Sequence, residues 1–331
     1  MDVSKRLIAG GIAGSLAKSV IAPLDRTKII FQTSSKVFNA RNAVREMIHI
    51  RKLEGFVGLW RGNSATVLRV FPYAGIQFCS FDLYKKMFSN DDTGHLTSLQ
   101  RLGAGSAAGA TAVVITYPLD LLRARLAVQR HVAGGAPLSY RHALSGGHEG
   151  AVRLRDLYRG LSPTLLGILP YAGIAFYTRD TLNGLAARRL ETTSLGTPLA
   201  VKLGAGAVSG LIAQSSTYPL DLVRRRMQTE GYTPADGAAA AAGAPRVTES
   251  RYVSIAGTLR TIHSEGGARA LFKGLSMNWI KGPVAFMISF TAFDYLKLFF
   301  HIRVAAAEDF RRNKPQHADE HHPAEPPPPH S

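Results

Sequence analysis

The chain has 331 residues, of which 46% are hydrophobic, and a formal net charge of +17 at pH 7. Its one cysteine, Cys79, excludes a disulfide within the chain and any metal site built from several cysteines. So basic a chain suits contact with anionic lipid, anionic small molecules or nucleic acid. Nucleic acid fits worst, because the basic residues alternate with apolar stretches of membrane length and no helix-turn-helix, zinc-finger or aromatic RNA-binding signature occurs.

A six-residue motif recurs three times along the chain. The copies begin at Pro23, Pro118 and Pro219, and in each an acid follows the proline by two residues and a base follows the acid by three. Intervals of 95 and 101 residues indicate an internal repeat. Three further triplets recur in step: Trp60-Arg61-Gly62, Tyr158-Arg159-Gly160 and Phe272-Lys273-Gly274. The sequence therefore predicts three equivalent units, residues 1–92, 95–190 and 197–303.

Each unit is predicted to contain two long helices with a short one between them. The long helices are expected over 3–34, 63–89, 97–130, 162–187, 198–229 and 276–302, and short amphipathic helices at the membrane interface over 39–52, 141–150 and 251–264. Residues 231–250 are low in complexity, and 304–331 form a tail rich in proline and histidine. We expect both segments to be disordered.

Charges and glycines interrupt the apolar stretches in a regular way. A charge in the middle of a membrane span is costly, so Lys18, Arg69 and Lys281 are expected to face an aqueous interior. Three glycine pairs with four-residue spacing precede the prolines, and this spacing favours close approach of helix backbones. The pairs are Gly10 with Gly14, Gly105 with Gly109, and Gly206 with Gly210.

The three Pro-x-Asp-x-x-Lys/Arg motifs resemble the signature of the mitochondrial carriers, and the resemblance covers residues 5–302. It implies an all-α membrane protein, with six transmembrane helices arranged as three pseudo-threefold repeats around a central cavity and short helices on the matrix side. It also implies a monomer in the mitochondrial inner membrane, in contact with lipid such as cardiolipin. The chain starts without a cleavable presequence, so targeting is expected to be internal.

The acids and bases of the repeated motif are expected to form a matrix gate. Because a proline bends each odd-numbered long helix just before the motif, neighbouring helices can pair these charges around the pore. The expected pairs are Asp25 with Arg123, Asp120 with Arg224, and Asp221 with Lys28. The resemblance implies that Gln32 and Gln228 brace two of the pairs, whereas Ala127 leaves the third without a brace. The alternative is that the pairs only tie helices together.

A second gate is implied near the ends of the even-numbered long helices. Phe81-Asp82-Leu83-Tyr84-Lys85 and Phe293-Asp294-Tyr295-Leu296-Lys297 resemble the cytoplasmic gate motif of the family. The corresponding stretch beginning at Arg179 has Asp180 but ends in Asn183. The expected pairs are Asp180 with Lys297 and Asp294 with Lys85. Asp82 then meets only Asn183, so this gate is expected to be the weaker lock.

The substrate is expected to bind between the two gates. Counting back 13 residues from Asp82, Asp180 and Asp294 gives Arg69, Gly167 and Lys281 at one depth. With Lys18, the two bases form a cationic clamp suited to phosphate. The resemblance implies that Gly167 and Ile168 contact adenine. Tyr73 and Tyr171 either stack on the ligand or pack as core residues, and Arg179 either attracts anions or forms a solvated rim.

The stretches 22–32, 60–66 and 274–283 look most like those of coenzyme A carriers within the family. This implies an antiporter that imports coenzyme A in exchange for adenine nucleotides such as ADP or adenosine 3',5'-bisphosphate, with no cofactor and no enzymatic step. The alternative is a general adenine-nucleotide carrier of the ATP/ADP/AMP or ATP-Mg/phosphate type, in the mitochondrial or the peroxisomal membrane. A basic peripheral or nucleic-acid-binding protein is the alternative from another class.

Overall fold

The computed structural model describes residues 2–34, 36–89, 96–129, 140–144, 153–189, 199–230, 252 and 254–299. Within these ranges every regular element is a helix. The insertion expected at 231–250 and the tail expected at 304–331 lie outside the described residues.

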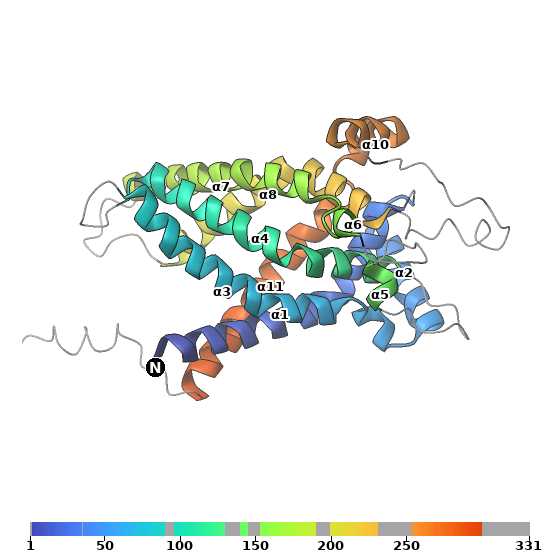
Figure 1. Ribbon diagram of the computed structural model, residues 1–331, viewed down its shortest axis with the longest axis horizontal. Coiled ribbons are helices and arrows are strands. Elements are labelled where there is room, and N and C mark those ends of the chain that lie inside the picture. The colour runs from blue at the N-terminus through green and yellow to red at the C-terminus, as the bar shows by residue number, and fades with distance from the viewer. Residues whose placement is uncertain are drawn as a thin grey trace, which may run out of the picture.

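Six long helices form the body of the molecule (Figure 1). They are α1 (Asp2–Thr33), α3 (Asn63–Phe88), α4 (Ser98–Val128), α7 (Leu161–Arg189), α8 (Leu199–Thr229) and α11 (Leu275–Phe299). Every predicted boundary is confirmed to within three residues. Each helix has one internal proline, which removes a backbone hydrogen bond and favours bending.

The helices are joined most extensively across repeat boundaries. The helix α3 packs against α4, α7 against α8, and α11 against α1, while the contacts within each repeat are smaller. Because α11 closes back onto α1, the three repeats form a ring. The fold is therefore a closed arrangement of three helical hairpins.

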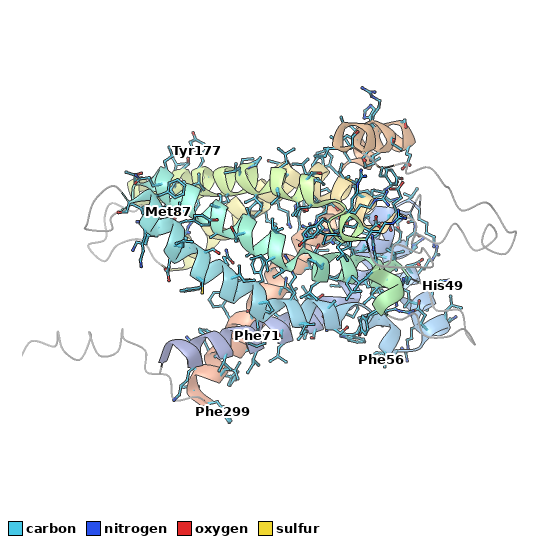
Figure 2. The ribbon with its side chains drawn as sticks, viewed as in Figure 1. His49, Phe56, Phe71, Met87, Tyr177 and Phe299 are labelled. Carbon is cyan, nitrogen blue, oxygen red and sulfur yellow. The ribbon has the colours of Figure 1, made fainter. Side chains whose placement is uncertain are left out.

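The outer surface of this ring is apolar. Exposed side chains include Phe71, Met87, Tyr177 and Phe299, several of which project outward from the ribbon in Figure 2. By length and composition alone, two helical stretches, Ser98–Val128 and Leu154–Ala186, are long and apolar enough to cross a membrane. The helices α1 and α11 each carry a lysine in the interior of the helix, Lys18 and Lys281.

Short helices gather at one end of the ring, around the C-terminal ends of α1, α4 and α8 (Figure 1). They are α2 (Ala40–Glu54), η1 (Val57–Trp60), α5 (Tyr140–Leu144), α6 (Leu154–Leu157) and α10 (Ile255–Ala270). The helix α10 runs past the predicted end because a second helical segment follows a kink at Gly266 and Gly267. Gly267 has a φ of 65°, which favours glycine. The helix predicted at 141–150 is described only as far as Leu144.

Three buried arginines tie this end of the ring together. Each arginine donates from Nε to a backbone carbonyl near the C-terminal end of α1, α4 or α8. Each of these carbonyls belongs to the residue nine positions after a repeated proline. The bonds run from Arg26 to Ala127 O (3.0 Å), from Arg125 to Gln228 O (3.2 Å) and from Arg226 to Gln32 O (2.8 Å). Orphan carbonyls at helix ends need such donors. The three arginines therefore join α1, α4 and α8 at one level.

The glycine pairs do not act as the sequence suggested. A Cβ added at Gly105, Gly109, Gly206 or Gly210 would meet no atom within 4 Å, so these four residues are not points of close helix contact. All four line a cavity instead. Tight contacts lie at other glycines, among them Gly11, where a Cβ would be 2.3 Å from the Phe71 ring. At Gly10 and Gly14 a Cβ would meet only side-chain atoms, at 4.0 and 3.9 Å. The prediction of close backbone approach was therefore wrong for this conformation.

Candidate functional site: a basic cavity between the repeats

A cavity of about 870 Å³ lies among α3, α4, α7 and α8. Among the described residues, its wall contains six arginines and two acids, Asp120 and Asp221. The arginines are Arg69, Arg101, Arg123, Arg179, Arg224 and Arg225. We call the part of the wall formed by Asp120, Asp221, Arg123, Arg224 and Arg225 the floor, and the part formed by the exposed side chains of Arg101 and Arg179 the mouth. The cavity therefore favours an anionic ligand.

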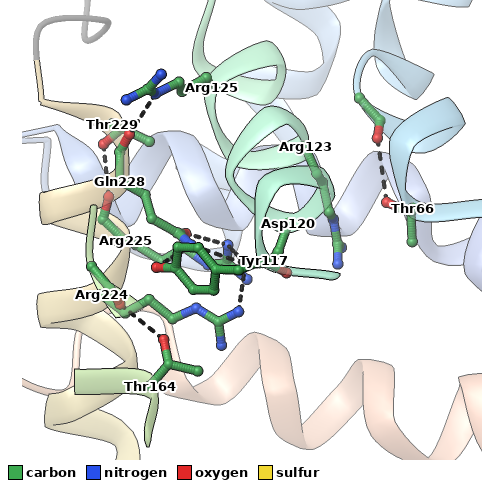
Figure 3. Close-up of polar contacts among 12 residues, drawn as sticks. Thr66, Tyr117, Asp120, Arg123, Arg125, Thr164, Arg224, Arg225, Gln228 and Thr229 are labelled. Atoms are coloured by element: carbon green, nitrogen blue, oxygen red, sulfur yellow. Dashed lines mark hydrogen bonds and ion pairs between the residues drawn. The ribbon is translucent and has the colours of Figure 1, made fainter. Parts of the chain in front are cut away.

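Two of the three expected ion pairs are present at the floor. Arg123 of α4 donates to Asp25 of α1, and Arg224 of α8 donates to Asp120 of α4. Arg225 adds a second cation 3.6 Å from Asp120. Figure 3 shows Arg224, Arg225 and Gln228 reaching from α8 toward Asp120. These contacts join α1 to α4 and α4 to α8.

The third expected pair, Asp221 with Lys28, is absent among the described residues, and that prediction was wrong for this conformation. The Lys28 ammonium instead lies over the ring of Tyr218, 5.2 Å from its centroid. An aromatic face attracts a cation without needing a carboxylate, which accounts for where Lys28 points. The junction between α1 and α8 therefore lacks the ion pair found at the other two.

Two of the three clamp cations are already engaged by the aspartates of the two ion pairs. Arg69 Nη1 lies 3.0 Å from Asp120 Oδ1, and Lys281 Nζ lies 2.6 Å from Asp25 Oδ1. Lys18 is close enough to Arg123, Asp25, Lys281 and Arg69 to interact electrostatically with each. The structure thus brings all three clamp residues to the level of the floor. Sequence reasoning missed that two of them share their aspartates with the gate.

Only part of the predicted substrate site lines the cavity. Arg69, Gly167, Ile168, Tyr73 and Tyr171 are among its lining residues, whereas Lys18 and Lys281 are not. The Arg69 guanidinium lies over the Tyr73 ring, 5.0 Å from its centroid. A Cβ at Gly167 would approach Leu220 to 3.8 Å, an ordinary contact distance. The glycine therefore contributes open space beside Ile168 and Leu220 to an apolar patch of the wall.

The two glutamines behave differently. Gln228 donates to Asp120 (2.9 Å) and to the Tyr117 hydroxyl (3.0 Å), so it supports the Asp120–Arg224 pair. Gln32 donates to the Tyr218 hydroxyl (2.9 Å), and within the described residues its side chain makes no bond to Lys28 or Asp221. Neither tyrosine was predicted to belong to the site, although each directly precedes a repeated proline.

The two tyrosines also link α4 and α8 to the repeated triplets. Tyr117 donates to Arg159 O (2.9 Å) and Tyr218 donates to Lys273 O (2.6 Å). Their rings stack on Tyr158 and Phe272, the aromatic residues of the same triplets, with centroid distances of 6.0 and 6.5 Å. Tyr117 therefore fixes the start of α7, and Tyr218 the start of α11, next to the floor.

The residues of the predicted cytoplasmic gate are not paired across helices at the mouth. Lys297 bonds Asp294 within α11 at 2.6 Å, three residues apart along the helix. In the part of the chain that the structure describes, Asp180 with Lys297 and Asp294 with Lys85 form no ion pair, and Asp82 likewise has none. The expected pairs are therefore absent from this conformation, in which the floor is bridged and the mouth is not.

Comparison with known proteins identifies the family. The family described as "Mitochondrial carrier protein" matches residues 1–92, 94–189 and 196–303. "Mitochondrial coenzyme A transporter SLC25A42" of Xenopus laevis is 47% identical over 301 residues, covering 90% of this chain and 86% of the relative. The protein of the same name from Homo sapiens is 47% identical over 302 residues, covering 90% and 88%. "Solute carrier family 25 member 16" of Bos taurus is 36% identical over 317 residues, covering 90% and 89%. The chain belongs to the mitochondrial carrier family.

Proposed function

We propose that this carrier imports coenzyme A into the mitochondrial matrix in exchange for an adenine nucleotide such as ADP or adenosine 3',5'-bisphosphate. The observation that carries the proposal is a cavity with six arginines and two acids, in a chain 47% identical to relatives named as coenzyme A transporters. In this proposal the six long helices cross the inner membrane, the floor faces the matrix, and the mouth faces the opposite compartment.

The proposed ligand matches the wall in charge and shape. Coenzyme A combines phosphate groups with a flat adenine base, and arginine binds phosphate in a bidentate manner. We assign the phosphates to the clamp of Lys18, Arg69 and Lys281, and the base to the open space at Gly167 and Ile168. Tyr73 and Tyr171 lie one turn toward the mouth, where their rings can contact the base or the pantetheine arm.

The shared aspartates suggest how binding opens the floor. A phosphate at the clamp competes with Asp120 for Arg69 and with Asp25 for Lys281, so each aspartate loses one of its cations. Removing a partner from a buried ion pair leaves an uncompensated charge and is strongly unfavourable. The ligand therefore lowers the stability of the bridged floor, which is the differential interaction that alternating access requires. Asp82, Lys85, Asp180, Asp294 and Lys297 would close the mouth in turn.

Reconstitution tests the proposal directly. Purified protein in liposomes loaded in turn with coenzyme A, ADP, ATP and adenosine 3',5'-bisphosphate should exchange external labelled coenzyme A. Uptake should depend on the internal substrate and stop in empty liposomes. Uptake that is equal in empty and loaded liposomes would refute exchange, and uptake of nucleotides without coenzyme A would favour the general adenine-nucleotide carrier.

Variants of the clamp locate the site in the same assay. Arg69→Ala and Lys281→Ala should each lower exchange by about 100-fold, since each removes a charged contact to phosphate worth roughly 3 kcal/mol. Lys52→Ala is the matched control, because Lys52 is an exposed base in the last turn of α2 and does not line the cavity. Exchange near the wild-type rate by either clamp variant would contradict the assignment.

A further inference from the structure

Two arginines of the cavity wall are not used by the floor. Arg69, Arg224 and Arg225 contact Asp120, and Arg123 contacts Asp25. Within the described residues, Arg101 and Arg179 form no ion pair, and both side chains are exposed. The two acids of the wall, Asp120 and Asp221, both belong to the floor. Asp180 adjoins Arg179 in sequence but is not a lining residue. The mouth therefore has cations with no carboxylate facing them in the wall.

The mouth lies well away from the inner site. Arg101 precedes Asp120 on α4 by 19 residues, which is roughly 28 Å along a helix. Arg179 follows Gly167 on α7 by 12 residues, or roughly 18 Å. A phosphate held at the mouth is thus several helical turns from the clamp. The two levels are separate positions along one path.

The repeat supports a basic level at the mouth. Arg101 stands 17 residues before Pro118, and the residues 17 before Pro23 and Pro219 are Arg6 and Lys202. Both positions fall inside long helices, α1 and α8. A base therefore occurs at the same helix level in all three repeats. Arg179 is an addition, because the equivalent positions in the other repeats are Phe81 and Phe293.

We propose that Arg101 and Arg179 form an outer phosphate-binding site, which holds a phosphate group of the entering ligand before the ligand moves inward to Arg69 and Gly167. Guanidinium groups are suited to this task, because they bind phosphate in a bidentate manner and stay charged at any working pH. The inference rests on the proposed function for the identity of the ligand. The outer site itself needs only a phosphorylated anion.

Such a site has a distinct kinetic signature. Basic residues at the entrance of a cleft raise the local concentration and capture rate of an anion, by 10-fold or more at low ionic strength. They do not take part in the step that opens the floor. Their loss should therefore raise the KM for an external anion and leave the maximal rate of exchange nearly unchanged. The dependence on salt should weaken at the same time.

The first test uses the full chain in liposomes. The double variant Arg101→Ala/Arg179→Ala should raise the KM for external coenzyme A about 10-fold, with the maximal rate within about twofold of wild type. Lys86→Ala is the matched control, because Lys86 is an exposed base in the last turn of α3 that does not line the cavity. An unchanged KM in the double variant, or an equal rise in the control, would overturn the outer site.

A second test does not depend on coenzyme A being the substrate. In detergent and phosphate-free buffer, pyrophosphate should raise the Tm of a clamp-deficient Arg69→Ala/Lys281→Ala variant, because the outer site remains. Adding Arg101→Ala and Arg179→Ala should remove that shift. If the clamp-deficient variant does not fold, the same comparison is made between wild type and the outer double variant, which should need several-fold more pyrophosphate for an equal shift. Equal responses would overturn the site, even where wild type fails to transport coenzyme A.

Discussion

Asp25 and Asp120 each bind cations from two directions. Asp25 contacts Arg123 and Lys281, and Asp120 contacts Arg69, Arg224 and Arg225. A carboxylate has two oxygens, and in both residues one oxygen accepts from the predicted gate partner while the other accepts from a clamp residue. A single side chain thereby connects the substrate site to the floor.

This double use limits what a charge exchange can restore. Asp25→Arg and Arg123→Asp should each lower exchange at least 10-fold, since each leaves a buried charge without its partner. The double variant should recover part of the loss, but not all, because Arg at position 25 faces Lys281 where an acid stood. The measurement is the initial rate of exchange in liposomes for the four proteins. Losses that simply add in the double variant would show that the two residues are not coupled.

Lys273 provides a pH-dependent feature outside the long helices. Its ammonium donates to Ser34 O at 2.6 Å. Burial, and after it the nearby cation of Arg226, lower the pKa of Lys273 from an ordinary value of 10.5 to about 8. The folded protein holds this proton less tightly than the unfolded chain. The contribution of Lys273 to stability therefore rises as the pH increases from about 8 toward 10.5.

The control for this effect is Lys273→Arg, whose guanidinium keeps its charge over the same range. When the pH rises from about 7 to about 9.5, the Tm of the wild type in detergent minus that of the variant should increase by about 2 °C. A Tm difference that stays constant across this range would show that Lys273 does not lose its proton there.

At the level of helices, the tyrosines before the repeated prolines set how α8 meets α11 and how α4 meets α7. Tyr218→Phe removes a bond to Lys273 O and a bond from Gln32, at a cost of about 1–2 kcal/mol. This should lower the Tm by roughly 2–6 °C. Tyr177→Phe is the control, because its ring is 74% exposed. Equal effects of the two substitutions would mean that the Tyr218 hydroxyl does not stabilise the junction.

The helices were predictable because their signals are local. Apolar runs of membrane length, the repeated prolines and the glycines after each aromatic-basic pair define boundaries without reference to distant residues. The role of Gly105 and Gly206 was not predictable in the same way. Four-residue glycine spacing permits a close contact, but whether it forms depends on how near the neighbouring helices lie, and at these two glycines no atom lies within 4 Å of an added Cβ.

In the site, only the contacts between equivalent positions of adjacent repeats could be predicted from the sequence. The pairs Asp25–Arg123 and Asp120–Arg224 follow from equal positions in adjacent repeats. The bonds from Arg69 and Lys281 to the same acids follow instead from side-chain reach between different helix levels, which no count along the chain reveals. For Lys28 the repeat predicted a pair that is not formed. Lys28 stands at the repeated position, but its ammonium lies over the Tyr218 ring and not beside Asp221.

Across the whole molecule, threefold sequence symmetry coexists with unequal junctions. The contacts of α1 with α4 and of α4 with α8 include ion pairs at the floor, whereas the junction of α8 with α1 relies on Gln32, Tyr218 and the Arg226 bond to Gln32 O. The Arg226 bond is charge-assisted, but Arg26 and Arg125 make the same bond at the other two junctions, so it does not replace the ion pair. The bond between Gln32 and Tyr218 joins neutral groups and is weaker than a charge-assisted one. The floor is therefore least strongly held between α8 and α1, although the sequence motif there is complete.

The volume of the cavity has a further consequence for energetics. At about 30 Å³ per molecule, a space of about 870 Å³ corresponds to roughly 30 waters. A carrier that fills this space with ligand and then reopens it on the other side must return that solvent to bulk and take it up again in each cycle. Osmotic pressure from a solute too large to enter would act on these hydration steps, so turnover becomes sensitive to water activity as well as to substrate concentration.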